Sequence, residues 1–514
     1  MIDFLKTIYK NSRIYQEKKA IVICDKSYTY KKIIQYALNL SLKFSEQPSS
    51  NNICVILSKK TNYFYVGMLA CFFSNKIYTP LNIHQGMEKS KQIIKIINPD
   101  IIFVGDIDWF ILDQFILDMT QAIILFSDKI FYRKCQKMNL KNTLYYVGDC
   151  FRKKCDFNVD KIYLASKNYA YLFFTSGSTG APKGVPISYQ NLNAYISSVL
   201  SIFSFNADDR FIQLSDIAFD ISIHEIIVCL TTGATLYIYD EKNELSIARF
   251  IYHNKITQCI LVPSSMPVII DQCKFYQCHF DTLKQTLICG EAFPLSFAKA
   301  WTLIAPTSAI VNLYGPTEAT VCCAYHHYQK ENDYGSLLTV PIGHPFPNTM
   351  LSVSNDHELI ITGDQVSDGY WLSDKKLLKQ FKYDTINQKM SYFTGDIVHY
   401  HTDFGFIFQG RRDDQWQVSG YRVEKNEVES VLRHVLDIAD IYIVPHYNTH
   451  QLIHSLIAFS TVRIDIASHK KNLSAFLPEP VIPEMIIQLE QIPRLPNKKI
   501  NYRKLLEILY ERSL

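Results

Sequence analysis

Short β-rich apolar runs alternate with amphipathic helical patterns over most of the chain, and this alternation restricts the possible folds most strongly. Residues 20–24, 52–57, 100–105 and 122–126 have strand composition, whereas residues 90–98 repeat apolar side chains at helical spacing. Strands that alternate with helices predict layered α/β structure built on parallel sheet. The chain has 514 residues, more than one hydrophobic core organises, so we expect at least two domains.

The pattern changes near residue 350. Residues 351–409 consist of short strand-like runs separated by turns, which predicts a small β-subdomain. After a polar turn at residues 410–414, a strand pattern followed by a helix pattern opens a compact unit of about one hundred residues. We therefore expect an N-terminal domain of residues 1–412 and a C-terminal domain of residues 413–514.

Composition argues against several classes of protein. Lys and Arg total 53 and Asp and Glu total 49, so the charge balance gives no basis for binding nucleic acid or an anionic membrane surface. No apolar stretch reaches the ~18–20 residues of a membrane-spanning helix, so we expect no membrane insertion. Thirteen cysteines without a disulfide-like spacing, and no secretory leader, favour a cytoplasmic protein with reduced thiols.

The most distinctive local feature is YLFFTSGSTGAPKG at residues 171–184. An apolar strand pattern runs into a loop of glycines and hydroxyl residues, and successive backbone N–H groups in such a loop form a concavity suited to phosphate oxygens. Lys183 adds a point charge, but its position differs from the lysine of the common P-loop. The loop residues are Thr175, Ser176, Gly177, Ser178, Thr179 and Gly180. A surface loop is the alternative interpretation.

Three further motifs follow in order. NLYGPTEATV at residues 312–321 offers the ring of Tyr314 for stacking on adenine, a tight turn at Gly315, and the carboxylate of Glu318 for Mg²⁺. YFTGDIV at residues 392–398 contains Asp396, whose two oxygens suit a pair of hydroxyl donors. IPRLPNKKINYRKL at residues 492–505 contains Lys499, a cation suited to the negative charge of a reacting phosphate.

Together these motifs resemble the signatures of the adenylate-forming superfamily, which includes acyl-CoA synthetases, luciferases and adenylation domains of nonribosomal peptide synthetases. The resemblance covers essentially the whole chain. It implies a large α/β adenylate-forming domain with a small β-subdomain, a small mobile α+β C-terminal domain that swings about Asp413, and the use of ATP and Mg²⁺. By resemblance, the nucleotide and metal site consists of the loop residues 175–180, Lys183, Tyr314, Gly315, Thr317, Glu318, Asp396, Arg411 and Lys499.

In that implied site, Thr175, Glu318 and Lys499 take part in the reaction, Glu318 binds the metal, and Asp396 accepts the ribose hydroxyls. Lys498 stands where the family usually has glycine. In the C-terminal domain, Gln417 and Ser419 stand where family members often carry basic residues. Both of the latter positions belong to the part that reorganises for thiol transfer.

FDISIHEI at residues 219–226 resembles the signature of amino-acid-activating members, in which an aspartate pairs with the substrate's α-ammonium. Asp220 matches that aspartate, and a helix cap is its alternative role. The matched pocket is small, mostly apolar and without a second charge, and a packed core histidine is the alternative for His224. The pocket positions are Asp220, Ile221, His224, Ser264, Leu287, Cys289, Leu313, Val321 and Cys322.

LICGEAF at residues 287–293 is similar to the D-alanine–carrier-protein ligases, which carry a cysteine at the position of Cys289. We therefore expect a small neutral amino acid, alanine- or proline-like, to be joined to AMP and then passed to the phosphopantetheine thiol of a separate carrier protein. The final signature lies within ten residues of the C-terminus, so we expect a stand-alone ligase without a fused carrier. An acyl- or aryl-CoA ligase and an inactive nucleotide-binding homologue are the alternatives.

Overall fold

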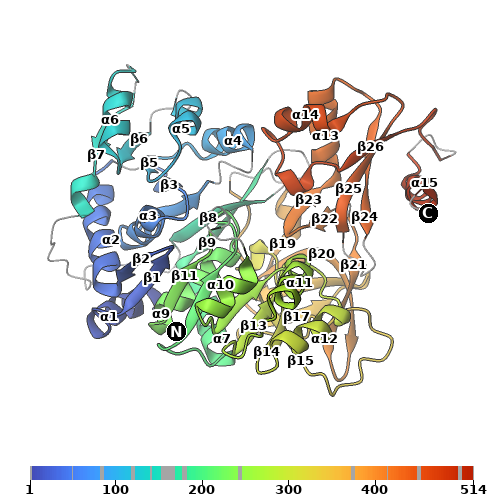
Figure 1. Cartoon of the computed structure of the whole chain (residues 1–514), viewed down its shortest axis with the longest axis horizontal. Coiled ribbons are helices and arrows are strands. Elements are labelled where there is room, and N and C mark those ends of the chain that lie inside the picture. Colours follow the sequence, from blue (N-terminus) through green and yellow to red (C-terminus); the bar gives the residue numbers. More distant parts are fainter. Residues whose placement is uncertain are drawn as a thin grey trace. The chain divides into compact units, whose positions relative to one another are not determined.

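The chain forms two compact units in the computed structural model. The large unit comprises residues 1–82, 93–174 and 184–410, and the small unit comprises residues 83–92, 175–183 and 411–514. The structure describes residues 3–48, 50–81, 86–116, 122–138, 140, 142–151, 168–175, 182–240, 246–371, 377–413, 415–447, 453–495 and 500–512. Figure 1 shows the helices and strands and labels most of them.

A nine-stranded sheet forms one layer of the large unit. Its central strands β10, β12, β13 and β14 run parallel, while β15 and β16 at one edge and β2 at the other are antiparallel to their neighbours. In spatial order the strands are β16 (His344–Pro345), β15 (Ala324–Tyr328), β14 (Ala309–Tyr314), β13 (Gln285–Ile288), β12 (Gln258–Leu261), β10 (Arg210–Gln213), β11 (Thr235–Ile238), β1 (Lys19–Ile23) and β2 (Lys26–Thr29).

A seven-stranded sheet forms a second layer of the large unit, and it is parallel from β7 through β8. Its strands in spatial order are β7 (Leu144–Tyr146), β6 (Ile123–Phe126), β5 (Ile101–Val104), β3 (Ile53–Leu57), β4 (Ile77–Pro80), β8 (Tyr169–Thr175) and β9 (Lys183–Ser188). β3 and β5 are buried at every position, as expected for strands covered on both faces.

Helices cover these sheets and join them into one core. α3 is apolar around its whole circumference and is buried from Phe64 to Phe73, which identifies it as an internal helix. One hydrophobic cluster contains Phe103 from the seven-stranded sheet and Leu287 from the nine-stranded sheet. The helices are α1 (Phe4–Ile14), α2 (Tyr30–Ser45), α3 (Asn62–Phe73), α5 (Trp109–Ile116), α6 (Lys129–Gln136), α7 (Tyr189–Ile202), α8 (Ile221–Ile223), α9 (Cys229–Thr232), α10 (Ile247–His253), α11 (Met266–Tyr276) and α12 (Leu295–Ile304).

The predicted β-subdomain is a five-stranded sheet in the last part of the large unit, and four of its strands pair antiparallel to their neighbours. Its strands are β17 (Thr349–Val353), β18 (Glu358–Gly363), β19 (Phe381–Asp384), β20 (Lys389–His401) and β21 (Gly405–Arg411). Leu359, Val398 and Phe406 pack with Ile342 into a small core of their own. The alternation of buried and less buried positions along β20 is the pattern of a sheet with one covered face.

The small unit is an α+β structure. It contains the three-stranded sheet β24 (Ile441–Tyr447), β25 (Ile453–Ser460) and β26 (Met485–Gln488), and the two-stranded sheet β22 (Gln415–Val418) and β23 (Tyr421–Glu424). Its helices are α13 (Lys425–Leu436), α14 (Ile466–Leu473) and α15 (Tyr502–Arg512), and α4 (Met87–Ile97) begins in this unit. The predicted fold class is confirmed, whereas the domain boundary and hinge at Asp413 stay predictions.

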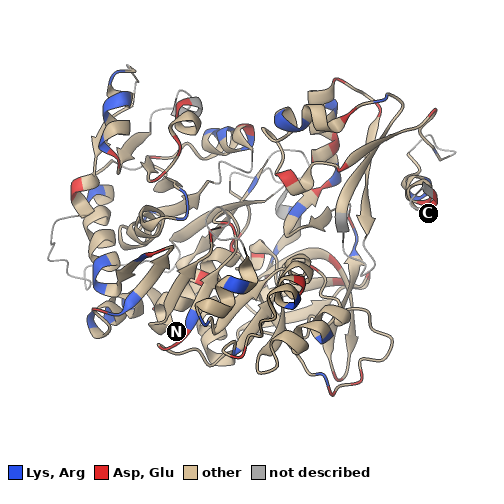
Figure 2. Cartoon of the chain, viewed as in Figure 1, with Lys and Arg blue, Asp and Glu red and all other residues tan. Residues whose placement is uncertain are grey.

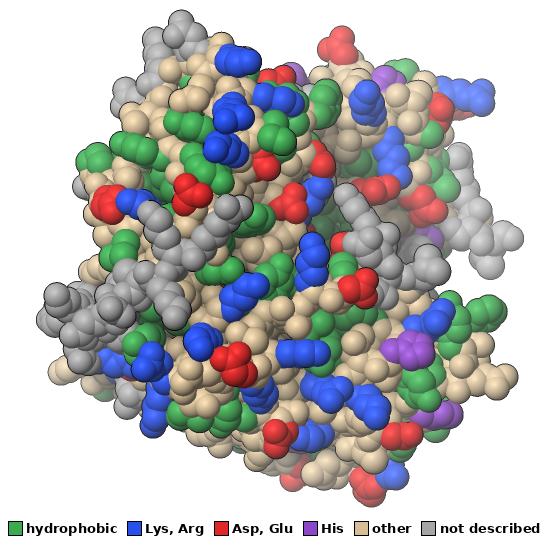
Figure 3. Space-filling model, turned by 60° about the vertical axis from the view of Figure 1, so that its left-hand side comes forward, with side chains coloured by type: hydrophobic (Ala, Val, Ile, Leu, Met, Phe, Trp, Pro, Cys, Tyr) green, Lys and Arg blue, Asp and Glu red, His purple; other side chains and the backbone are tan. Residues whose placement is uncertain are grey.

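The surface carries charges of both signs. Lys and Arg are interspersed with Asp and Glu on the elements of both units (Figure 2). On the face shown in Figure 3, basic and acidic side chains alternate with small groups of apolar ones. This mixture matches the nearly even count of 53 basic and 49 acidic residues. Within the described ranges, no helix is both long and apolar enough to cross a bilayer.

Candidate functional site

The predicted site residues follow the carboxyl ends of parallel strands. Asp220 follows β10, Ser264 follows β12, Cys289 follows β13, and Tyr314 is the last residue of β14. Thr175 is the last residue of β8 in the second sheet. The carboxyl ends of parallel strands are where open α/β sheets bind ligands, because the loops that leave them diverge. Sequence positions that lie far apart are thereby placed at corresponding strand ends.

Asp220 precedes α8 at the cap position, but its side chain makes no capping hydrogen bond. The helix-cap interpretation is therefore wrong. The residue keeps part of its surface open to solvent, yet its Oδ2 is enclosed and has no hydrogen-bond partner within the described ranges. Burial raises the pKa of Asp220 from 3.8 to about 6, with the hydroxyl of Thr317 opposing and the charge of Glu318 adding to this rise. The enclosed carboxylate oxygen can therefore bind a cation.

His224 lies in a π-helical turn at residues 224–228 that continues α8, and it is buried. Its Nδ1 lies 2.7 Å from the hydroxyl of Tyr195 on α7, a partner that the sequence did not reveal. Burial lowers the pKa of His224 to about 4, so the imidazole is neutral at pH 7. His224 therefore adds no charge to the predicted pocket.

Cys289 and Cys322 come together at the same site. Their Sγ atoms lie 3.2 Å apart, and both residues are buried. Burial raises the pKa of the Cys322 thiol well above its usual range, and both the hydrogen bond with Cys289 and the charge of Asp220 raise it further. The Cys322 side chain is consequently a neutral thiol at pH 7. Burial raises the pKa of the Tyr195 hydroxyl, which contacts His224, well above its usual range.

A strained turn carries Glu318 on one side and the pocket residue Val321 on the other. Thr320 and Val321 have φ values of 58° and 66°, a left-handed conformation that is uncommon for β-branched residues. Gln365 holds this turn, because its Nε2 donates to the carbonyl of Cys322 at 2.7 Å and to that of Ala319 at 3.3 Å. Strain of this kind persists only where the surroundings fix it, and it is common at functional sites.

The remaining pocket positions divide into apolar walls and one polar contact. Leu287 and Leu313 are buried in adjacent strands, and Ile221 packs against the same core. Ser264 is bound by Glu291, whose carboxylate accepts from the Ser264 amide at 2.8 Å and from its hydroxyl at 3.0 Å. The sequence analysis missed Glu291, although the motif LICGEAF contains it.

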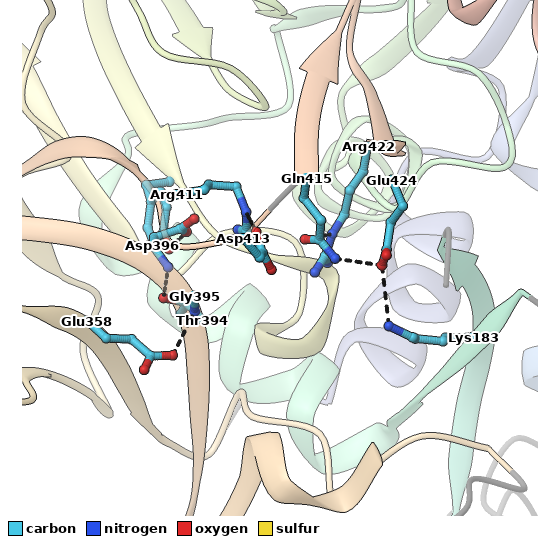
Figure 4. A network of polar contacts seen from close by, with 11 residues as sticks. Lys183, Glu358, Thr394, Gly395, Asp396, Arg411, Asp413, Gln415, Arg422 and Glu424 are labelled. Atoms are coloured by element: carbon cyan, nitrogen blue, oxygen red, sulfur yellow. Dashed lines mark hydrogen bonds and ion pairs between the residues drawn. The ribbon is translucent and has the colours of Figure 1, made fainter. Parts of the chain in front are cut away.

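Asp396, the predicted ribose-binding aspartate, accepts a hydrogen bond from within the chain. The hydroxyl of Tyr314 donates to Oδ2 of Asp396, which is buried on β20. The loop around Asp396 is fixed by hydrogen bonds from its amide to Thr394 at 3.0 Å and from the Gly395 amide to Glu358 at 2.9 Å (Figure 4). The two residues that the motifs assign to adenine and ribose are thus neighbours across 82 positions of sequence.

Glu318 is completely buried, and its Oε1 accepts from the hydroxyl of Tyr370 at 2.7 Å. The Thr175 hydroxyl is also enclosed, and within the described ranges it has no hydrogen-bond partner. No group of three or more His, Cys, Asp or Glu side chains that could hold a metal occurs in the described part of the chain. One buried carboxylate fits Mg²⁺, which proteins bind with one or two carboxylates, substrate phosphates and water.

The small unit contains a buried polar network around Lys183. The ammonium of Lys183 lies 3.4 Å from Oε1 of Glu424, which also accepts from Gln415 at 2.7 Å (Figure 4). Arg422 donates in turn to the Gln415 carbonyl oxygen at 3.1 Å. Lys183 and Glu424 are each 7% exposed, so the pair is shielded from solvent. The loop lysine is therefore neutralised by a carboxylate of its own unit.

Arg411 and Asp413, the predicted nucleotide arginine and hinge residue, form a bidentate ion pair. Nε of Arg411 donates to Oδ1 of Asp413 at 2.7 Å, and Nη2 donates to Oδ2 at 3.0 Å (Figure 4). The predicted loop residues 176–180 and the two candidate lysines, Lys498 and Lys499, lie outside the described residues.

Known proteins resemble this chain in sequence and in fold. The profile of the family described as AMP-binding enzyme matches residues 9–371, and the chain belongs to this family of enzymes. The resemblance to the adenylate-forming superfamily is thereby confirmed. The D-alanine--D-alanyl carrier protein ligase of Staphylococcus epidermidis is 28% identical over an alignment that covers 99% of this chain and 100% of that protein.

Solved structures of adenylation domains have the same fold as this chain. The Vibrio cholerae adenylation domain AlmE, in complex with glycyl-adenosine-5'-phosphate, has a TM-score of 0.85 and 26% identity, with 99% of this chain and 98% of that chain covered. The artificially fused adenylation–PCP di-domain NpsA-ThdA from Klebsiella oxytoca shares the fold, with a TM-score of 0.76 and 19% identity over 99% of this chain and 97% of that one.

Proposed function

We propose that this chain activates a small neutral amino acid with ATP, forming an aminoacyl-AMP, and transfers the aminoacyl group to the phosphopantetheine thiol of a separate carrier protein. The names of the two most informative relatives, a D-alanyl carrier protein ligase and an adenylation domain bound to glycyl-AMP, support both the reaction and the size of the substrate. The site supports it independently.

The enclosed, unpartnered carboxylate oxygen of Asp220 is the observation that carries this proposal. Burial raises the pKa of this carboxylate to about 6, because the charged form is costly without a partner. A cation that enters the same space would stabilise the charged form. The α-ammonium of an amino acid is such a cation, whereas a fatty or aryl acid brings none. Asp220 thus favours an amino-acid substrate over the simple acids of the acyl- and aryl-CoA ligases.

The groups around Asp220 favour a short, uncharged side chain. His224 is neutral, the sulfur atoms of Cys289 and Cys322 lie 3.2 Å apart, and Leu287 is buried. Such a lining offers no counter-ion for an acidic or basic side chain. Alanine of either hand, proline and, from the AlmE complex, glycine are the candidates, and differences of one methylene are worth only ~1–3 kcal/mol in such a pocket.

In the adenylation step, a carboxylate oxygen of the amino acid attacks the α-phosphorus of ATP and pyrophosphate leaves. Tyr314 stacks on the adenine, Asp396 accepts from the ribose hydroxyls, and Thr175 with the loop at residues 176–180 donates to phosphate oxygens. Lys499 faces the negative charge that builds on the α-phosphate. The carboxylate of Glu318 would hold Mg²⁺, which would further neutralise the charge of the phosphates. No protein nucleophile is needed.

In the transfer step, the sulfur of the carrier's phosphopantetheine attacks the carbonyl carbon of the mixed anhydride. The bond from that carbon to the phosphate oxygen breaks, AMP leaves, and the thiol proton passes to solvent. Rotation of the C-terminal domain about Asp413 exchanges the groups that face the site between the two steps, as hinge motions do in other enzymes. Arg411 supports the nucleotide before that rotation.

ATP–pyrophosphate exchange tests the proposal. Purified protein with Mg²⁺ is assayed against D- and L-amino acids, together with several fatty and aryl acids. Strong exchange with one small neutral amino acid is expected. Exchange confined to a fatty or aryl acid would assign the chain to the CoA ligases, and no exchange with any acid, despite nucleotide binding, would favour an inactive homologue.

A further inference from the structure

Tyr370 contacts the carboxylate that we assign to the metal. It lies between β18 and β19, is 7% exposed, and donates its hydroxyl hydrogen to Oε1 of Glu318 at 2.7 Å. No signature motif pointed to this tyrosine. A hydrogen bond to a charged acceptor in an enclosed place is stronger than one between neutral groups, because little water competes for it.

The phenol oxygen also lies 2.9 Å from Oε1 of Gln380. A phenol has one proton, so Tyr370 cannot donate to both Glu318 and a carbonyl oxygen. The conflict is resolved when the NH₂ group of the Gln380 amide faces the phenol, because the amide then donates to the phenol oxygen. The three side chains then form a relay in which Gln380 donates to Tyr370, and Tyr370 donates to Glu318.

The surrounding structure holds this relay in place. The amide of Ser367 donates to the carbonyl of Glu318 at 2.8 Å, so the segment that carries Tyr370 also binds the backbone of Glu318. The ring of Tyr370 packs edge-on against Phe381, with centroids 5.1 Å apart and an interplanar angle of 83°. Backbone and side chain of Glu318 are thus both fixed by one neighbouring segment.

We propose that Tyr370 is a positioning residue that orients the Glu318 carboxylate and thereby sets the affinity of the site for its divalent cation. This inference rests on the proposed function, in which Glu318 binds Mg²⁺. A hydrogen bond to Oε1 fixes the plane of the carboxylate and the direction that its second oxygen presents. Mg²⁺ demands near-ideal octahedral geometry, so a carboxylate that rotates freely binds it less well.

The test compares Tyr370→Phe with Tyr78→Phe in the full chain. Tyr78 is buried, and its hydroxyl has no hydrogen-bond partner among the described residues, so its variant controls for the loss of a buried phenol oxygen. Mn²⁺ binding in the presence of α,β-methylene-ATP is measured by the electron paramagnetic resonance signal of free Mn²⁺. We expect Tyr370→Phe to raise the Kd for Mn²⁺ about tenfold and Tyr78→Phe to change it less than twofold.

A second readout separates positioning from general damage. In the exchange assay, Tyr370→Phe should raise the Mg²⁺ concentration for half-maximal rate about tenfold and leave the KM for the amino acid unchanged. Equal loss of metal affinity in both phenylalanine variants, or an unchanged Kd in Tyr370→Phe, would overturn the inference. If Tyr370→Phe does not fold, Gln380→Leu decides, with an expected rise in the Kd for Mn²⁺ of about threefold.

The same measurements keep the two proposals apart. An inactive wild-type protein whose Mn²⁺ affinity still falls in Tyr370→Phe would reject the proposed function and retain the role of Tyr370. An active wild-type protein whose Tyr370→Phe variant has normal metal dependence would reject the role of Tyr370 alone.

Discussion

Replacing Asp220 by Asn should stabilise the protein and at the same time abolish most of its activity. Asn resembles the protonated carboxylic acid in shape and charge, so the variant removes only the cost of an enclosed anion. A pKa that rises from 3.8 to about 6 corresponds to about 3 kcal/mol for a fully enclosed carboxylate. The part of Asp220 that is open to solvent reduces this, and we expect about 2 kcal/mol.

The difference in stability between Asp220→Asn and the wild type should increase with pH. The pKa of Asp220 is higher in the folded state, so between pH 3.8 and about 6 the folded protein binds more protons than the unfolded chain. The wild type therefore loses stability, relative to Asp220→Asn, as the pH rises through this window. Urea denaturation should show the full difference at pH 7.5 and almost none at pH 4.

The same variant should lose its affinity for the substrate. Removing one partner of a buried charge pair costs about 2–5 kcal/mol, which corresponds to a loss of roughly 30-fold to several thousandfold in kcat/KM for the amino acid. The KM for ATP should change little. A variant that is less stable than wild type at pH 7.5, or that retains its kcat/KM, would refute the assignment of Asp220.

Asp209 offers a matched control. It is a buried aspartate whose carboxylate lies 2.7 Å from the ammonium of Lys284. Burial raises the pKa of Asp209, but hydrogen bonds from Lys284, the Asn206 amide and Thr257 outweigh burial and lower it. Asp209→Asn should therefore destabilise the protein at pH 7.5 and leave the substrate KM unchanged, the opposite of Asp220→Asn on both counts.

Four further outcomes are expected. The kcat/KM for the amino acid should fall about tenfold per pH unit below pH 6, as Asp220 takes up its proton. Gly315→Ala should unfold at a markedly lower urea concentration than wild type, because its Cβ would lie 2.4 Å from the backbone of the pocket turn. At Gly335, a Cβ would have nothing within 4 Å, so Gly335→Ala should lower the free energy of unfolding by only about 1 kcal/mol. Cys289→Ala should enlarge the pocket and shift the ratio of exchange rates about tenfold toward an amino acid one methylene larger. Lys183→Met should lower the free energy of unfolding by about 3 kcal/mol, measured by urea denaturation, since it leaves a buried carboxylate without its cation.

Local pattern was sufficient to predict the elements that build the fold. The apolar run at residues 52–57 became β3, that at residues 100–105 became β5, and the helical pattern at residues 90–98 became the main part of α4, which ends at Ile97. Each of these segments carries its own periodicity, and parallel strands covered on both faces read as continuous apolar runs. Residues 351–409 likewise formed the expected small β-subdomain.

The site was predictable only where a motif placed its residues next to one another. The turn with Tyr314 and Glu318 is one such motif. The hydrogen bonds of Tyr370 with Glu318 and of Tyr195 with His224, in contrast, join positions 52 and 29 residues apart. The contact of Cys289 with Cys322 likewise spans 33 residues. Such pairs are set by strand order and by the approach of loops at strand ends, and neither follows from local periodicity.

The most direct test of the central claim is to identify the acyl-adenylate that forms. The protein is mixed with ATP, Mg²⁺ and an equimolar set of D- and L-amino acids, fatty acids and aryl acids, then quenched and analysed by mass spectrometry. The proposed function predicts one dominant aminoacyl-AMP with a small neutral side chain, and its absence from a parallel reaction of Asp220→Asn. A fatty or aryl acyl-AMP, or an aminoacyl-AMP formed equally well by that variant, would contradict it.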